Sequence, residues 1–401
     1  MMLFLTAYAA CMLLFIYLYR GMNAGFLLFA GAAVLSLLLH RKQSTGRPAP
    51  RVAAYDRLRL LGIVLIAATH TIHANMTLTE NGTPAAHLAA AAWMVTIVCN
   101  PLYVMLCGAL LYRRKETSVI SFWTDKLLRV MLPMFLYYLW YLWAHEKLWG
   151  QAYAVPAGDA LRDFFSMAPP EAPHFWLIWR ILFLYLTAPL IGRLLRALSY
   201  RQLSALFLAG LAVCSAVTYL PLLTNSGISR SEWPEWIFAA IAGWWVSREE
   251  TRRYDHLLIV TGAVSGCLIA ILGCRWADHP LITLFVCNTA PLAILFTAGI
   301  MALFLRLSKG ETSSGLLSFL ARYNYDCVLI HWGALYFIVR ELPGFAGGQL
   351  PLPLLTLAEI GLTLVFSIAA AFGIRRFLVF PVLTLAEMLK RAVRPPAETG
   401  R

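Results

Sequence analysis

The residues best suited to chemistry in this 401-residue chain lie in one stretch, residues 55–76, which reads YDRLRLLGIVLIAATHTIHANM. Asp56 stands three residues before Arg59, and His70 follows Arg59 by eleven residues. Eleven residues of α-helix rise about 16 Å, so Arg59 and His70 are expected at different depths of one helix. His73 lies one turn beyond His70 on nearly the same face. A histidine in such an apolar helix could bond to another helix, relay a proton, ligate a metal or act as a general base.

Cationic residues form the second group of interest. The segment 122–133, FWTDKLLRVMLP, places Lys126 three residues before Arg129, so the two cations share a face of an α-helix. Two interpretations are open for this pair and for Arg59. They anchor helix ends among lipid headgroups, or they form a basic entrance for a phosphorylated cytoplasmic ligand, because Arg and Lys both bind phosphate well.

Other ionisable residues lie in apolar stretches, where each costs several kcal/mol unless it is paired or hydrated. His174 opens one such stretch, Asp326 and His331 lie in a second, and Glu359 lies in the last. Some of these side chains are expected to pair across helices, and the sequence does not assign the pairs. His174, Asp326 and His331, together with Asp56 and His73, are our candidates for residues that support the site.

The motifs of soluble catalysis are missing from the sequence. It contains no P-loop, no G-x-S-x-G elbow, no H-E-x-x-H helix and no dinucleotide-binding glycine fingerprint. The eight cysteines make no C-x-x-C pair. Because no carboxylate or thiol cluster accompanies His70 and His73, we expect no metal site.

The elements that must position these residues are apolar helices. The chain is 60% hydrophobic and 13% charged, against about 25% charged in a typical soluble domain. Stretches long enough to span about 30 Å of hydrocarbon recur at residues 2–19, 23–39, 58–78, 88–112, 127–145, 174–192, 203–222, 234–247, 256–274, 281–305, 318–339 and 354–374. Lipid offers no partners to bare backbone groups, so these stretches should be helical. We predict an all-α, polytopic integral membrane helix bundle with about twelve transmembrane helices.

The net charge of +13 is concentrated in alternate loops. Most Lys and Arg residues lie in the segments 41–59, 113–129, 193–201, 248–253, 306–322 and 375–401. Cationic loops stay on the cytoplasmic side, so both termini are predicted to be cytoplasmic. Nucleic-acid binding needs a continuous basic face, and we expect none.

We predict four regions along the chain. Residues 1–40 form two additional helices, residues 41–57 a basic cytoplasmic linker, residues 58–380 a ten-helix core, and residues 381–401 a basic cytoplasmic tail. The stretch after Arg375 begins apolar and could form a helix in the membrane interface.

From Tyr55 to about Arg376 the chain resembles acyltransferase family 3, the membrane O-acyltransferases that modify bacterial surface polysaccharides. The matching positions are Asp56, Arg59 and His70 in the family's first core helix, Lys126, Arg129 and Pro133, then His174 and Trp176 with Tyr185 and Pro189, and finally Val328 to His331. The chain departs from the family at three positions. Lys126 replaces an Arg, Val328 replaces a Tyr, and Asp326 stands where a small residue is expected.

The resemblance implies transfer of an acyl group, with acetyl expected, from cytoplasmic acyl-CoA to a hydroxyl of a surface glycan or its lipid-linked precursor. Arg59, Lys126 and Arg129 would bind the acyl-CoA phosphates, and His70 would act as general base or carry the acyl group. The implied location is the bacterial cytoplasmic (inner) membrane, among its lipids. Oligomeric state is left open.

Two alternatives stay open at this stage. A proton-coupled secondary transporter of an acidic solute or glycan precursor would use His70 and His73 as proton carriers. It predicts flux without consumption of CoA esters, and the sequence shows no inverted repeat in its support. A sensor or scaffold that kept the fold without activity would tolerate the loss of His70.

Overall fold

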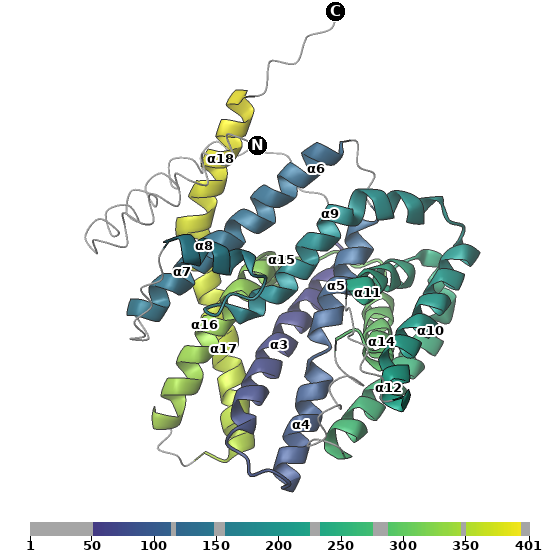
Figure 1. Cartoon of the computed structure of the whole chain (residues 1–401), viewed down its shortest axis with the longest axis horizontal. Coiled ribbons are helices and arrows are strands. Elements are labelled where there is room, and N and C mark those ends of the chain that lie inside the picture. Colours follow the sequence, from purple (N-terminus) through teal and green to yellow (C-terminus); the bar gives the residue numbers. More distant parts are fainter. Residues whose placement is uncertain are drawn as a thin grey trace, which may run out of the picture. The chain divides into compact units, whose positions relative to one another are not determined.

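The computed structural model describes residues 51–113, 118–147, 157–224, 233–275, 288–345 and 350–393 (Figure 1). Within these ranges every regular element is a helix, and the single β feature is an isolated bridge between Val52 and Thr312. The predicted all-α class is therefore confirmed for the described part of the chain. The leading spans predicted at 2–19 and 23–39 lie outside the described residues.

The helices have the following bounds: α3 Ala53–Met76, α4 Pro84–Thr96, α5 Cys99–Leu111, α6 Val119–Lys126, η1 Leu127–Met131, α7 Leu132–Lys147, α8 Ala157–Phe165, η2 Pro173–Phe175, α9 Trp176–Ala197, α10 Tyr200–Thr224, α11 Trp233–Val246, η3 Glu249–Tyr254, α12 Asp255–Arg275, α14 Pro291–Leu307, α15 Gly315–Arg322, α16 Asn324–Phe345, α17 Leu352–Ile374, η4 Arg375–Val379 and α18 Phe380–Val393. The predicted span 88–112 is thus two helices, α4 and α5. The predicted tail after residue 380 is helical through Val393.

Seven helical stretches of the described residues are long and apolar enough to cross a membrane: Ala53–Met76, Pro84–Leu111, Val119–His145, Pro173–Ala197, Tyr200–Tyr219, Glu249–Arg275 and Leu352–Met388. Two shorter apolar helices lie at Glu235–Val246 and Pro291–Leu307. The protein is a membrane helix bundle, and the total of twelve spans stays a prediction.

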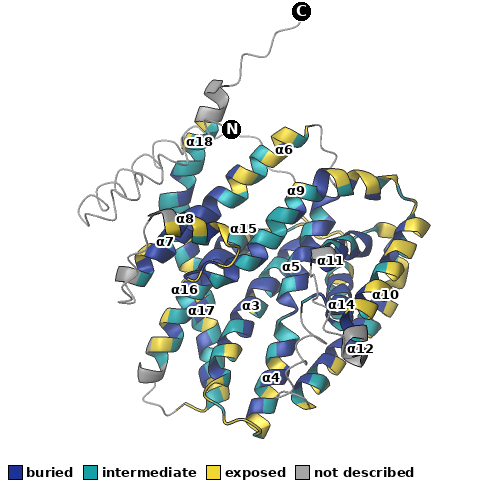
Figure 2. Ribbon diagram, in the orientation of Figure 1, coloured by how far each residue is buried: buried dark blue, intermediate teal, exposed yellow. Residues whose placement is uncertain are grey.

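The described helices divide into two compact units, of which the larger comprises Ala49–Val119 and Phe183–Ile368. Within it, α3 packs against α4, α5, α14, α15 and α16. The apolar window of α3 is 50% buried inside the protein, against 22% for α10, on which Figure 2 shows many exposed residues. The helix that carries His70 is therefore central in this unit, whereas α10 is suited to face lipid.

Glycines allow two helices of the larger unit to cross in backbone contact. A Cβ added to Gly108 of α5 would overlap the carbonyl oxygen of Ala240, and one added to Gly243 of α11 would overlap that of Met105. The two positions are reciprocal across the α5–α11 crossing. Such close approach is characteristic of membrane helix pairs, in which dispersion contacts replace the hydrophobic effect between helices.

The described helices of the smaller unit lie in Ile120–Leu182 and from Ala369 to Val393, and they include two π-turns, η1 and η4. Each π-turn ends two residues before a proline, Pro133 or Pro381. Proline has no N–H for the carbonyl four residues earlier, so the preceding turn cannot keep α-helical bonding. At the end of η1 the Leu132 N–H instead donates to the carbonyl of Leu127.

Candidate functional site

The first helix of the larger unit, α3, is fastened at its start to the loop between α14 and α15. The Ser313 N–H donates to the Arg51 carbonyl at 2.7 Å, and the Ala53 N–H donates to the Glu311 carbonyl at 3.2 Å. The Arg57 guanidinium also pairs with the Glu311 carboxylate at 2.7 Å. The bond from Ala53 satisfies one of the backbone donors that a helix N-terminus leaves open. As a result α3 begins at Ala53, five residues before the predicted span.

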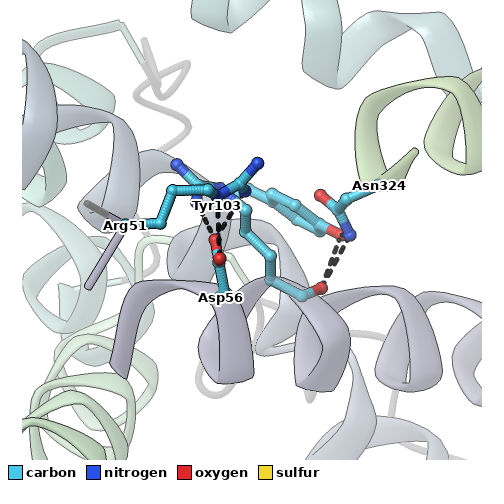
Figure 3. Close-up of polar contacts among 5 residues, drawn as sticks. Arg51, Asp56, Tyr103 and Asn324 are labelled. Carbon is cyan, nitrogen blue, oxygen red and sulfur yellow. Dashed lines mark hydrogen bonds and ion pairs between the residues drawn. The ribbon is translucent and has the colours of Figure 1, made fainter. Parts of the chain in front are cut away.

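Asp56 accepts bonds from two guanidinium groups while its own side chain is fully buried (Figure 3). Arg51 donates from Nε at 2.8 Å and from NH2 at 2.6 Å, in the bidentate geometry that favours Arg over Lys. Arg59 donates from NH1 at 2.5 Å. The side chains of Arg51 and Arg59 are 33% and 27% exposed. The triad therefore keeps one net positive charge that water, and hence an anionic ligand, can reach.

The backbone carbonyl of Arg59 is held from two other helices (Figure 3). Asn324, the first residue of α16, donates to it at 2.7 Å and to the Tyr103 hydroxyl at 3.0 Å. The Tyr103 hydroxyl of α5 donates to the same carbonyl at 3.4 Å. Tyr103 reaches this position because residue 62 is glycine, since a Cβ there would lie 2.8 Å from the Tyr103 ring. Three helices thus fix the position of Arg59.

His70 lies between two side chains of α16. Its ring stacks on His331 with centroids 5.2 Å apart and planes at 26°, and meets the Trp332 ring edge-on at 5.0 Å. His331 is buried, whereas His70 is only partly buried. The aromatic contacts hold the His70 ring in place, which a histidine that transfers a proton in one direction requires.

A hydrogen bond fixes the protonation pattern of His331. Its Nδ1 lies 2.8 Å from the carbonyl oxygen of Val328. A carbonyl only accepts, so Nδ1 must carry the hydrogen, and in the neutral ring Nε2 is the basic nitrogen. The sequence placed His331 among supporting residues, and the structure brings it to His70 from 261 residues further along the chain.

His73 does not join this stack. Its ring stacks on Trp93 of α4 with centroids 5.2 Å apart and planes at 29°. Asp326, the third residue of α16, is fully buried in the first turn of that helix, where a helix N-terminus favours an acidic side chain. Among the residues that the structure describes, no three His, Cys, Asp or Glu side chains group as a metal site would require.

Three predicted site residues belong to the smaller unit. Lys126 ends α6 with its ammonium 5.4 Å from the centre of the Phe122 ring. Arg129 lies in the π-turn, donates to Asp125 at 2.6 Å and pairs with Glu387 of α18 at 3.2 Å, with 62% of its side chain exposed. His174 is buried, with its ring edge-on to Tyr141 and Phe175. That these residues share one donor site with Arg59 stays a prediction.

Sequence analysis missed several residues of this region. Arg51 lay in the predicted linker, and its position five residues before Asp56 was the available signal. Tyr103, Asn324 and Trp332 come from helices distant in sequence, and no local pattern connects them with α3. Gly62 could have been noticed as a glycine inside an apolar helix, which usually marks close packing.

Comparison with known proteins identifies the family of the chain. The family described as an acyltransferase domain matches residues 52–376, from the residue before α3 to the π-turn that follows α17. No curated protein and no solved structure gives a match. The match covers most of the chain and includes His70, Arg59 and the Lys126–Arg129 pair. The chain belongs to acyltransferase family 3.

Proposed function

We propose that the protein is a membrane O-acyltransferase that moves an acyl group, acetyl by preference, from cytoplasmic acyl-CoA to a hydroxyl of a cell-surface glycan or its lipid-linked precursor. The observation that carries the proposal is the setting of His70. It is a partly buried histidine, stacked on a buried His331, in the helix that also carries the Arg59–Asp56 pair.

His70 acts on the acceptor in this proposal. Its basic ring nitrogen takes the proton of the acceptor hydroxyl as the oxygen forms a bond to the thioester carbonyl carbon. The carbon–sulfur bond then breaks, and the CoA thiolate leaves and receives a proton. Stacking on His331 and edge contact with Trp332 limit rotation of the imidazole. A ring held in one orientation favours proton transfer along one direction.

Arg59 binds the donor in this proposal. Its NH1 is committed to Asp56, which leaves the Nε–H and NH2 groups for a phosphate oxygen of CoA. Lys126 and Arg129 add positive charge for the same ligand. Donor binding through these cations should weaken as salt rises. Salt screens the attraction between solvent-accessible charges, and the screening length is about 10 Å at 0.1 M salt.

The test is transfer of radiolabelled acetyl from acetyl-CoA to envelope glycan in inverted membrane vesicles. Wild-type protein is compared with His70→Ala and with His256→Ala, whose exposed ring lies 2.9 Å from the Arg306 guanidinium and has no part in the proposed site. We expect label in the glycan with wild type and His256→Ala, and a fall of at least a hundredfold with His70→Ala at equal membrane levels.

Other outcomes would change the proposal in distinct ways. Equal transfer by His70→Ala and wild type would remove His70 from the mechanism and leave the enzyme assignment standing. Label retained on the protein itself in the absence of glycan, and released by hydroxylamine, would indicate an acyl-imidazole intermediate in place of general-base catalysis. No transfer from any of several acyl-CoA donors, combined with solute flux, would favour the transporter.

A further inference from the structure

A row of buried polar side chains lies on the side of α3 that bonds to α17 and begins at Thr71, the residue after His70. Thr71 and Asn75 are four residues apart on α3, and Glu359 and Thr363 are four residues apart on α17, so each pair lies on one helix face. Asn75 Nδ2 joins the two helices by donating to Thr356 at 2.9 Å and to Glu359 Oε2 at 2.5 Å. We call Thr71, Asn75, Glu359 and Thr363 the buried polar row.

Each member of the buried polar row keeps a polar atom without a hydrogen-bond partner in the protein. These atoms are Thr71 Oγ1, Asn75 Oδ1, Glu359 Oε1 and Thr363 Oγ1. The four side chains are between 0% and 4% exposed. A buried polar atom without a partner is destabilising, so four on adjoining helix faces point to a ligand or water that completes them.

The threonines of the row behave differently from others in the same helices. Thr69 of α3 donates to the carbonyl of Leu65, and Thr356 of α17 donates to that of Leu352, in the four-residue pattern usual for membrane helices. Thr297 of α14 does the same with Ala293. Thr71 and Thr363 make no such bond. Their hydroxyls are therefore directed away from their own backbones.

The chemistry of the open atoms selects the ligand. Both amide hydrogens of Asn75 are used, so Asn75 and Glu359 each offer an acceptor oxygen, and the two threonine hydroxyls can accept or donate. Acceptor oxygens suit a ligand rich in O–H donors and repel an anion such as the CoA phosphates. A carbohydrate, which presents several hydroxyls at neighbouring positions, fits this set.

We propose that the buried polar row binds hydroxyl groups of the glycan acceptor, with Glu359 as the main hydrogen-bond acceptor. Asn75 is five residues from His70, a rise of about 7.5 Å, which is the scale of one sugar ring. A sugar held by the row would present another of its hydroxyls to His70. The inference rests on the proposed function, because it assigns the acceptor to that site.

The test uses two variants and a matched control in the full-length protein. Glu359→Gln keeps the side-chain volume. If the amide oxygen of the new Gln side chain accepts from Asn75, its NH2 group takes the place of the open acceptor Oε1 and donates instead. Thr363→Val removes one open hydroxyl at nearly constant volume. Thr297→Val is the control, because that buried hydroxyl is already satisfied by its own helix. The probe is glycan extracted from the envelope of the strain that encodes the chain.

Two measurements are made on each variant. The first is the KM for the glycan and for acetyl-CoA during transfer, and the second is the increase in thermal midpoint that the glycan produces without acetyl-CoA. We expect KM for the glycan to rise at least tenfold in Glu359→Gln and about threefold in Thr363→Val. KM for acetyl-CoA should not change. The glycan-induced increase in midpoint should shrink in both variants and persist in Thr297→Val.

The outcomes separate this inference from the function on which it rests. Transfer by wild type with unchanged glycan KM in both variants would overturn the acceptor site and leave the acyltransferase assignment intact. The same result with lowered midpoints would show that the row holds ordered water only. Glycan binding by wild type that the variants lose, without any transfer, would support the site and overturn the function. Neither binding nor transfer by wild type would overturn both.

Discussion

Asp56 is the residue on which the donor end of the site depends. Removing its charge would leave two guanidinium groups facing each other with no anion between them, because Arg51 and Arg59 both point at its carboxylate. The pairing also restrains Arg59, since a bonded guanidinium samples fewer rotamers than a free one. Asp56 is thus a positioning residue for a cation that we assign to donor binding.

We predict that Asp56→Asn destabilises the protein by about 2 kcal/mol. Breaking a fully buried pair costs about 3–5 kcal/mol, and the partial exposure of both arginines reduces that figure. The measurement is the thermal midpoint of the detergent-solubilised protein. Glu249→Gln serves as the control, because its pair with Arg252 is exposed and should contribute less than about 1 kcal/mol. Equal midpoints for the two variants would contradict the role given to Asp56.

Residue spacing predicted part of the site and could not predict the rest. The positions of Asp56, Arg59 and His70 in one helix follow from the 3.6-residue period, and in the structure Arg59 donates to Asp56 one turn earlier. The residues of other helices that contact α3 could not be predicted in this way. Asn324 and His331 reach α3 from more than 250 residues away, and nothing in a local pattern specifies which distant helix packs against which face.

At the scale of helices, the sequence predicted where the apolar helices lie better than where those helices are interrupted. Hydropathy located the apolar stretches, and the described part of each predicted core span contains a helix. It did not locate the break between α4 and α5 or the two π-turns, because average hydropathy is the same on both sides. Pro133 and Pro381 were the available signals for the π-turns, since a missing N–H disturbs the preceding turn.

We predict that Gly243→Ala prevents correct packing of α11 on α5. The added methyl group would overlap the Met105 carbonyl, and backbone atoms cannot move aside as a flexible side chain can. Overpacking of this kind costs about 1–3 kcal/mol or more. Size-exclusion chromatography in mild detergent would show a reduced yield of monodisperse protein.

Gly361→Ala in α17 is the control for that experiment, because a Cβ added there meets no atom within 4 Å and the residue is exposed. It should leave the monodisperse yield unchanged. A Gly243→Ala protein with the wild-type yield would mean that the crossing is looser than the structure describes.

At the scale of the larger unit, segments predicted to lie on one side of the membrane contact each other. The chain at 51–57 is bonded to 308–313, the Arg196 guanidinium donates to the Tyr112 carbonyl at 2.9 Å, and Tyr200 bonds to Thr251 at 3.2 Å. All of these segments were predicted to be cytoplasmic from charge alone. At the other end of α3, Asn75 bonds to the first turns of α17. The contacts agree with the predicted grouping of loops by side.

We predict that the side carrying Lys309 is cytoplasmic and that the side carrying Glu80 is exterior. Both residues are exposed and lie in loops at opposite ends of the larger unit's helices. A membrane-impermeant maleimide should label Glu80→Cys in intact spheroplasts and label Lys309→Cys only after permeabilisation, relative to the unlabelled wild-type background. The reverse pattern would invert the topology and with it the side from which acyl-CoA enters.

The contacts of α3 also bear on the order in which parts of the protein can fold during synthesis. Ribosomes deliver α3 to the membrane early, whereas Asn324, His331 and Glu359 are synthesised in the last fifth of the chain. Until they arrive, His70 lacks His331, Asn75 lacks Glu359 and the Arg59 carbonyl lacks Asn324, in surroundings where lone polar groups are costly. The Arg59 guanidinium already has Asp56 in its own helix. The nascent protein therefore has to shelter α3 beside the insertion machinery or in water. Completion of translation, through α16 and α17, is the event that releases this helix into the bilayer.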